Sequence, residues 1–404
     1  MTFIFDAHTH YTPPSLKENL KTFGEKEPFW GLLITPDSSH NVQGWATAER
    51  MIADMDQGGV DKAVILGAYR QTAENARETN DETLEVMQKY KDHILGFGVV
   101  APHPLSEALD EVKRCVDSGM LGIGELNPYG QGISFEDPNF LTIVEACIDA
   151  NLVLNLHVSE EVGHFYLGKS TTRLLDYYHL AYRYPELKLV LAHWGGGLFF
   201  YEIMPEVRRT LKNVYYDTAT TPLLYPTQSI FNVALQCVSH KKLLYGSDYP
   251  LIVYPRKQKE PDFWQFLNEI KELGLPEDVY EDVMGKNAAR LFGMLPSEPV
   301  EETEVQTRKS GGDSRVITEI QDPKSMHISG NMAISAVASA WPVTRQVFEK
   351  YGIPWKDTPV PFWEPIAQAA AAQMMGPKVR QQLINDLNDA IGYKEPPNSL
   401  LLKE

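Results

Sequence analysis

Apolar runs alternate with segments of helical period along the chain up to about residue 292. The runs predict strands at about 2–9, 62–68, 94–101, 120–127, 152–159, 188–194, 213–219 and 242–248. Amphipathic stretches predict helices at about 47–57, 81–91, 105–118, 139–150, 172–183, 199–211 and 227–238, with further helix over 262–292. Eight apolar strands that alternate with helices indicate parallel pairing and an α/β fold. They favour a closed (β/α)8 barrel, the TIM barrel, over an open sheet.

The pattern changes after residue 295. Residues 296–315 are polar, contain Pro and Gly and lack periodicity, which predicts a linker. Residues 316–404 regain a helical pattern, so we expect a barrel domain at 1–295 followed by a small all-α domain. We expect this second domain to have a regulatory or docking role.

Two histidines stand at the end of the first predicted strand. Alternate side chains of a strand share a face, so His8 and His10 point the same way, as two ligands of one metal ion require. Asp248 ends the last strand and is soon followed by Pro250, which cannot extend the ladder. A carboxylate in that position is costly to desolvate unless a cation compensates its charge. The pattern therefore favours a bound metal ion.

Ligand-type side chains also end three of the middle strands. In a parallel barrel the carboxyl ends of all strands meet at one mouth, where the chemistry of this fold takes place. The side chains expected to converge there are His8, His10, Glu125, His157, His193 and Asp248. Imidazoles and carboxylates together suit Zn²⁺, with Mn²⁺ or Fe²⁺ as alternatives. For Glu125, metal binding, substrate contact and a salt bridge inside the barrel stay open, and Asp217 is expected to be structural.

Composition narrows the class of protein. The 404-residue chain is 43% hydrophobic, which suffices for at least one large core. A formal net charge of −17 without a basic run argues against nucleic-acid binding. Three cysteines far apart argue against a disulfide framework and against a cysteine zinc site. We find no apolar stretch long enough to span a membrane and no signal-peptide pattern, so we expect a cytoplasmic protein.

Several motifs resemble those of one enzyme superfamily. They are Asp6-Ala7-His8-Thr9-His10, His157, Leu191-Ala192-His193-Trp194-Gly195-Gly196 and Tyr245-Gly246-Ser247-Asp248-Tyr249-Pro250, in this order. With the segment 285–293, they resemble the amidohydrolase superfamily over about 1–293, and within it the amidohydrolase-2 (amidohydrolase-related) branch. That branch includes metal-dependent hydrolases and non-oxidative decarboxylases of the aminocarboxymuconate semialdehyde and resorcylate types.

The resemblance implies roles for the clustered residues. It implies that His8, His10, His157 and Asp248 hold one divalent ion with a water, and that His193 polarises the carbonyl or carboxylate of the substrate. Asp248 beside the ion can take the proton of that water and pass it to a leaving group. A homodimer is the habit of the family.

Glu125 leaves a second version of the site open. It resembles the bridging glutamate of two-metal hydrolases. In that version His8, His10 and Asp248 hold one ion, His157 and His193 hold the other, and Glu125 bridges them. The number of ions, one or two, therefore stays open at this point.

The substrate is indicated by less specific features. The segment 11–46 is unusually long and contains aromatic side chains, which predicts a lid over the mouth. The side chains expected to contact substrate are Tyr129, Trp194 and Tyr249, beside ligand positions, and Arg70, after the second strand. They suggest a small substrate that is partly apolar, aromatic or anionic. Packing of the loops and a surface salt bridge are the plainer alternatives.

We therefore expect a metal-dependent hydrolase that acts on an amide, lactone or ester bond of a small molecule. The alternative is a metal-dependent non-oxidative decarboxylase of a small unsaturated or aromatic carboxylic acid, which uses the same ion to bind a carboxylate. Residues 332–353 resemble part of a small helical domain of unknown function, and this likeness assigns no chemistry.

Overall fold

The computed structural model describes residues 2–18, 20–34, 42–163, 166–296, 327–330, 332, 334–355 and 366–393. The chain divides into two compact units, Met1–Gln306 and Thr307–Glu404, each with a hydrophobic core of its own. The predicted linker at 296–315 lies outside the described residues, except for Pro296.

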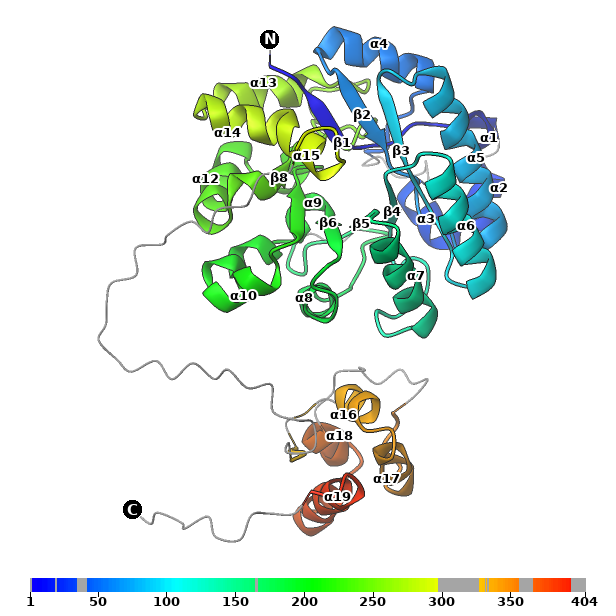
Figure 1. The fold of residues 1–404 in the computed structure, drawn as a ribbon, viewed down its shortest axis with the longest axis vertical. Helices are drawn as coiled ribbons and strands as arrows, with labels where there is room; N and C mark the ends of the chain where they lie inside the picture. Colours follow the sequence, from blue (N-terminus) through cyan, green and yellow to red (C-terminus); the bar gives the residue numbers. More distant parts are fainter. Residues whose placement is uncertain are drawn as a thin grey trace, which may run out of the picture. The chain divides into compact units, whose positions relative to one another are not determined.

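The first unit is built on eight parallel strands in the order β1 to β8. Their bounds are Phe5–Thr9 (β1), Lys62–Ile65 (β2), Ile94–Gly98 (β3), Gly122–Leu126 (β4), Val153–Leu156 (β5), Lys188–Leu191 (β6), Val214–Asp217 (β7) and Leu243–Leu244 (β8). The strands form the centre of the unit and helices surround them (Figure 1). The predicted α/β barrel is confirmed. Each strand is shorter than its apolar run. From β2 to β8 the residues past the carboxyl end leave the ladder, whereas β1 loses residues only at its amino end.

Hydrogen bonds beyond β8 bring the last strand to the first. The backbone NH of Ala7 donates to the carbonyl of Tyr245 at 2.8 Å, and the NH of Asp248 donates to the carbonyl of His8 at 3.0 Å. An isolated parallel bridge joins Thr9 to Tyr249. These contacts nearly close the barrel, and they place Asp248 beside the histidines of β1.

Helices follow the strands as the apolar period predicts. Their bounds are Ala48–Gly58 (α4), Ala73–Lys89 (α5), Leu105–Asp117 (α6), Pro138–Asp149 (α7), Leu174–Arg183 (α8), Ala192–Gly195 (α9), Leu198–Ile203 (η1), Pro205–Thr210 (α10), Thr221–Leu224 (α11), Thr227–Cys237 (α12), His240–Lys242 (η2), Trp264–Glu272 (α13), Glu277–Glu281 (α14), Asp282–Lys286 (η3) and Asn287–Leu291 (α15). Thr47 caps α4 because its side chain accepts a hydrogen bond from the NH of Arg50. Asp137 caps α7 in the same way.

One helix is longer than its apolar pattern predicts. α5 begins at Ala73, well before the predicted start at 81, and Thr72 caps its first turn. Its buried face is largely polar, so hydrophobic periodicity understates its length. Asn80 on this face is satisfied, because its side-chain amide donates to the carbonyl of Val99 at 2.8 Å and to Glu111 at 2.7 Å.

The segment 11–46, predicted as a long loop, is partly helical. Its described part contains α1 (Pro14–Glu18), α2 (Leu20–Lys26) and α3 (Pro28–Ile34). Proline is favoured at the start of a helix because its missing NH would have no partner there, which explains the starts at Pro14 and Pro28. The rings of Phe23 and Trp30 pack edge to face with centroids 5.0 Å apart, so α2 lies against α3.

Apolar side chains fill the interior of the barrel. The ring of Phe292, just after α15, lies 5.5 Å from that of Phe5 and 5.6 Å from that of Phe97. A larger apolar cluster packs between the strands and the surrounding helices. The barrel is therefore a packed core, and its chemistry is confined to the loops at the ends of the strands.

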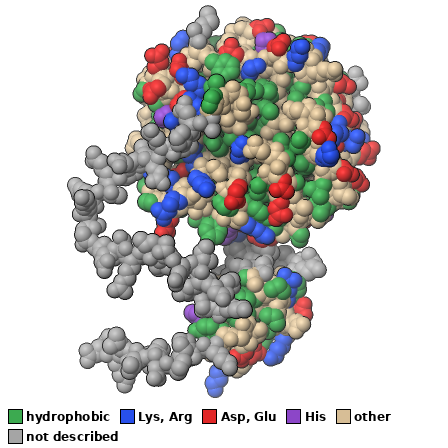
Figure 2. Space-filling model, in the orientation of Figure 1, with side chains coloured by type: hydrophobic (Ala, Val, Ile, Leu, Met, Phe, Trp, Pro, Cys, Tyr) green, Lys and Arg blue, Asp and Glu red, His purple; other side chains and the backbone are tan. Residues whose placement is uncertain are grey.

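The second unit is helical, as the pattern after residue 315 predicts. Its described helices are α16 (Ile334–Ala340), α17 (Thr344–Lys350), α18 (Ile366–Ala372) and α19 (Pro377–Ala390). Phe348, Leu383 and Leu387 are fully buried in its core. Among the helices described in either unit, none combines the length and apolar character needed to cross a membrane. Acidic and basic side chains are interspersed on the face of the barrel unit in Figure 2.

Candidate metal centre

His8 and His10 project from the carboxyl end of β1. The register of β1 against β2 shifts between Asp6 and Thr9, an irregularity of the kind that re-aims side chains at functional sites. The two Nε2 atoms lie 3.3 Å apart. Nδ1 of His10 lies 3.0 Å from the carbonyl oxygen of Leu66, so Nε2 is left to face a ligand.

Asp217, at the end of β7, positions two of the histidines. Its Oδ2 accepts a hydrogen bond from Nδ1 of His8 at 2.9 Å, and its Oδ1 accepts one from the backbone NH of His193 at 2.9 Å. His8 and Asp217 are fully buried. This pairing leaves Nε2 of His8 to face His10. Asp217 is thus structural, as expected, but its structural role is to aim the site histidines.

Asp248 approaches the same point from the loop after β8. Its Oδ1 lies 3.6 Å from Nε2 of His8 and 3.4 Å from Nε2 of His10. Its φ of 63° is left-handed, a strained conformation that clusters at functional sites. Gly246 permits this close approach, because a Cβ there would lie 2.8 Å from Cβ of His8.

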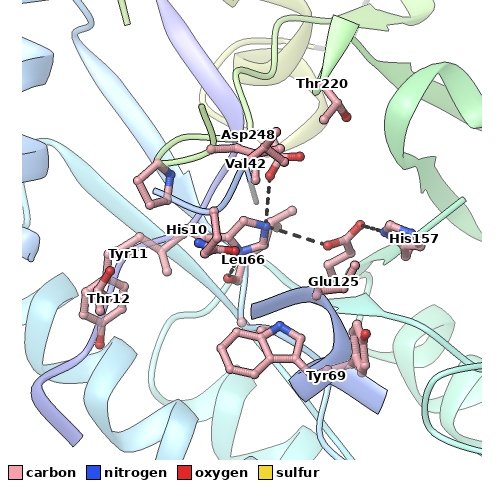
Figure 3. Close-up of a pocket in the computed structure, with 18 of the residues that line it drawn as sticks. His10, Tyr11, Thr12, Val42, Leu66, Tyr69, Glu125, His157, Thr220 and Asp248 are labelled. Atoms are coloured by element: carbon pink, nitrogen blue, oxygen red, sulfur yellow. Dashed lines mark hydrogen bonds and ion pairs between the residues drawn. The ribbon is translucent and has the colours of Figure 1, made fainter. Parts of the chain in front are cut away.

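Glu125 enters from β4. Gly124 has a φ of 142°, and a Cβ there would lie 2.5 Å from a backbone oxygen of β5, so glycine is required before the glutamate. Oε2 of Glu125 lies 3.9 Å from Nε2 of His8 and 3.7 Å from Nε2 of His10. Oε1 lies 2.8 Å from Nδ1 of His157. Glu125 therefore spans from the β1 histidines to His157 (Figure 3).

His157 and His193 lie next to Glu125. Nδ1 of His157 is 3.2 Å from Nε2 of His193, and the latter is 3.4 Å from Oε1 of Glu125. Nε2 of His157 lies 3.2 Å from the hydroxyl of Ser159. Nδ1 of His193 lies 2.5 Å from the hydroxyl of Thr220. The structure thus brings together all of the predicted ligands, with His157 held by protein partners at both ring nitrogens.

The donor atoms lie close enough together to hold a metal ion. Two sets of donors each lie within 4.8 Å of one another, His8–His10–Asp248 and His8–Glu125–His193. Tetrahedral ligands at about 2.1 Å from a cation lie about 3.4 Å apart. In the first set the separations are 3.3, 3.4 and 3.6 Å. His8 belongs to both sets, so the residues fit a metal site built around it.

Opposite charges dominate the electrostatics of the site. Burial would lower the pKa of His8, but the charges of Asp217 and Glu125 outweigh burial and raise this pKa to about 10. Burial would raise the pKa of Asp248, but the hydrogen bond from His10 and the charge of His8 lower it to about 2. The carboxylates of Asp248 and Glu125 are therefore ionised at neutral pH and draw positive charge into a buried place, as a cation site requires.

A cavity of about 640 Å³ lies over these side chains, within the size range of small-molecule sites. Its polar end is formed by His10, Glu125, His157, His193, Thr220 and Asp248. Its walls are largely apolar and include Tyr11, Leu16, Trp30, Leu33, Trp45, Leu66, Tyr69, Tyr166 and Leu223. The cavity therefore suits a small molecule with one end at the metal ligands and an apolar body.

Arg70 lines this cavity, but Trp194 lies outside it. Trp194 is fully buried, its indole NH donates to the hydroxyl of Thr221 at 2.8 Å, and its ring packs on Phe231 at 5.1 Å. Both His193 and Trp194 adopt left-handed φ values, so the chain turns sharply and the indole points into the core. The structure does not support the predicted substrate contact of Trp194.

Tyr249 and Tyr129 also lie outside the cavity lining. The ring of Tyr249 stacks on Phe263 at 4.3 Å, and its hydroxyl donates to Asp54 at 2.7 Å. Tyr129 is 44% exposed and packs edge-on against Phe29 at 5.4 Å. A place beside a ligand in the sequence therefore does not fix where a side chain points, because the loops after the strands turn irregularly.

Thr220 is a site residue that the sequence pattern does not single out. Its hydroxyl contacts Nδ1 of His193, and its own φ of 61° is left-handed. The available signal is its place just past the end of β7, in the run Asp217-Thr218-Ala219-Thr220. Any polar residue in such a position can reach the mouth of a barrel.

Comparisons with known proteins agree with this geometry. The profile of the family described as Amidohydrolase matches residues 5–294. A 2-amino-3-carboxymuconate-6-semialdehyde decarboxylase of Dictyostelium discoideum is 22% identical over 249 residues, which are 55% of this chain and 67% of that protein. The 5-carboxyvanillate decarboxylase structure from Sphingomonas paucimobilis matches with a TM-score of 0.59 at 16% identity, over 72% of this chain and 99% of that one.

A second solved structure shows a related fold with a metal. It is the 5-carboxyvanillate decarboxylase of Novosphingobium aromaticivorans complexed with manganese and 4-hydroxy-3-methoxy-5-nitrobenzoic acid. It matches with a TM-score of 0.57 at 18% identity, over 72% of this chain and 96% of that one. Likeness at these identities shows the fold, whereas the family match covers the whole barrel and its metal site. The chain belongs to the amidohydrolase family of metal-dependent enzymes.

Proposed function

We propose that this enzyme is a non-oxidative decarboxylase of a small aromatic or unsaturated carboxylic acid that works with one divalent ion. The observation that carries the proposal is the family match together with the named relatives, which are decarboxylases. The placement of Glu125, between the histidines of β1 and His157, is compatible with either reaction. The curated relative and the two solved structures named above are decarboxylases, which supports the same choice.

The metal ligands of the proposal are His8, His10 and Asp248, with Glu125 beside them. A divalent ion held there would supply a Lewis acid for a carboxylate oxygen of the substrate. Asp217 keeps His8 in the tautomer that offers Nε2 to the ion. Imidazole and carboxylate donors suit both Zn²⁺ and Mn²⁺. Manganese is bound in one related structure, so both metals enter the test.

His193 is the residue to which we assign proton transfer. Burial would lower its pKa, but the hydrogen bond to Glu125 and the charge of Asp248 outweigh burial and raise it. Both interactions favour the protonated form of His193, at the polar end of the cavity. In decarboxylation the bond from the carboxylate carbon to its neighbour breaks, CO₂ leaves, and the electron pair stays on that neighbour. That carbon then takes the proton of His193.

The apolar walls contribute by orienting the substrate and excluding water. Trp30, Trp45 and Leu66 line the cavity. A flat acid enclosed by such walls is held with its carboxylate towards the metal ligands, and the developing charge is shielded from water.

The test uses purified protein loaded with Mn²⁺ or Zn²⁺. Hydroxybenzoates and unsaturated acids are assayed for CO₂ release, and a panel of lactones, esters and amides is assayed for hydrolysis. We expect CO₂ release that His193→Asn lowers by about 10²- to 10⁴-fold while bound metal is retained. Hydrolysis of the panel without CO₂ release from any acid would show that the hydrolase expectation was right and this proposal wrong.

A further inference from the structure

Arg70 forms a second polar position in the cavity wall. It lies just past the end of β2, is 3% exposed and lines the same cavity as the metal ligands. Its guanidinium carbon lies 4.6 Å from the ring centroid of Phe23 and 5.2 Å from that of Trp30. The two ring centroids lie 5.0 Å from each other, so both rings lie on the same side of the guanidinium and cover one of its faces. The N–H donors lie along its edges.

Hydrogen bonds use part of those edges. Nη1 donates to the carbonyls of Ala68 at 2.9 Å and Tyr69 at 3.0 Å. Nε is buried and has no hydrogen-bond partner in the described part of the chain. Burial lowers the pKa of Arg70 to about 10, so the group is still charged at neutral pH. A buried donor of a charged group without a partner is costly, which points to a ligand as its partner.

The acidic side chains near Arg70 do not supply that partner. Glu27 uses Oε2 to accept from the NH of Gln71 at 2.9 Å and Oε1 to accept from the side-chain amide of Asn75 at 2.7 Å. Glu82 also lines the cavity, and burial raises its pKa, which weakens its competition for the arginine. Among the described residues, no carboxylate lies within ion-pair distance of Arg70.

We propose that Arg70 binds a second anionic group of the substrate, so that the enzyme acts on dicarboxylates. One carboxylate lies at His8, His10 and Asp248, and the other accepts hydrogen bonds from the free edge of Arg70. Arginine suits this role because its planar fork matches a carboxylate. The assignment of the reacting end rests on the proposed function, whereas the anion position at Arg70 rests on its burial and its unpartnered Nε.

The test measures binding to Mn²⁺-loaded protein by calorimetry. The probes are 2-hydroxybenzoate, with one carboxylate, and two dicarboxylates, 4-hydroxyisophthalate and 2-hydroxyterephthalate, which differ in the spacing of their acids. We expect one dicarboxylate to bind about 10- to 100-fold more tightly than 2-hydroxybenzoate. Arg70→Met should abolish this preference and change the affinity for 2-hydroxybenzoate less than about threefold.

Further variants separate the charge from the fold. Arg70→Lys keeps the positive charge but lacks the planar guanidinium, so it should retain only part of the preference for dicarboxylates. This variant also provides a test if Arg70→Met does not fold. Arg77→Met removes an arginine whose side chain is 62% exposed on α5 and should leave the preference intact. Glu82→Gln should preserve or strengthen it.

Two results would overturn the inference. They are equal affinity of the wild type for all three probes, and an equal loss for all probes in Arg70→Met. The readout does not depend on turnover. A preference that depends on Arg70, seen without CO₂ release, would contradict the proposed reaction and leave the anion position standing.

Discussion

Asp217→Asn tests how the barrel aims its first histidine. The amide oxygen of the variant can still accept from the backbone NH groups of His193 and Ala219, which lie 2.9 and 3.1 Å from Oδ1 of the wild-type aspartate. The amide nitrogen replaces Oδ2, 2.9 Å from Nδ1 of His8. It is a donor, so His8 must accept at Nδ1 and carry its proton on Nε2, the nitrogen that faces the metal position.

The expected loss follows from this reversal of the tautomer. Removing the partner of a metal-bound histidine typically lowers metal affinity by about 10- to 100-fold. Loss of the Asp217 charge also lowers the pKa of His8. A metal ion then displaces the proton on Nε2 more easily, which offsets part of the loss of metal affinity. We therefore expect about a tenfold weaker affinity at pH 7.5, equivalent to about 1.4 kcal/mol.

The assay is competition for Mn²⁺ and Zn²⁺ between the metal-free protein and a fluorescent chelator. Asp282→Asn is the matched control, because Asp282 is also a buried aspartate paired with a histidine, His240 at 3.1 Å, and it lies outside the cavity. The control should keep wild-type metal affinity even where it lowers stability. Unchanged or tighter metal binding in Asp217→Asn would refute the reasoning about the tautomer.

Three further predictions concern the barrel as a whole. Nζ of Lys242 lies 2.6 Å from Oε2 of Glu202 in a buried ion pair, so Lys242→Met should cost about 3–5 kcal/mol in chemical denaturation. Lys242→Met with Glu202→Leu should recover most of that loss, and an undiminished stability of the single variant would contradict the pairing. Burial raises the pKa of Cys115 and Cys147 to about 12, and Cys237 is buried too. A thiol reagent should therefore label none of the three cysteines in the native protein at pH 8 and all three after denaturation. Raising the pH to 9 should not change native labelling of Cys115 and Cys147, since their thiols stay protonated until the pH nears 12, and rapid native labelling would show that these residues are not buried. Removal of metal by a chelator should lower the melting temperature by about 4 °C relative to protein with metal at 100 times its Kd, and an unchanged melting temperature would argue against a tightly bound ion.

The sequence predicts the barrel and its ligand cluster well, because both follow from local pattern. Apolar runs locate all eight strands, and the position of a polar residue at the end of a strand is enough to bring His8, Glu125 and Asp248 to one mouth. Periodicity is weaker where a buried face is polar, as in α5, whose start was predicted too late. The cytoplasmic location and the homodimer stay predictions.

Side-chain direction in the loops could not be predicted from pattern. Trp194 and Tyr249 follow site residues in the sequence, yet both turn into the core, because His193 and Asp248 adopt left-handed backbone conformations. Such conformations depend on tertiary contacts and carry no signal in the apolar period. For the same reason Thr220 was overlooked although it touches His193.

We expect donors from distant strands of the barrel to hold one divalent ion. The most direct measurement is anomalous diffraction at the manganese edge from crystals grown with Mn²⁺. We predict one strong peak in the barrel, bonded to His8 Nε2, His10 Nε2 and Asp248. A barrel mouth without a peak in fully loaded crystals, or a peak whose ligands exclude the two histidines of β1, would contradict the account.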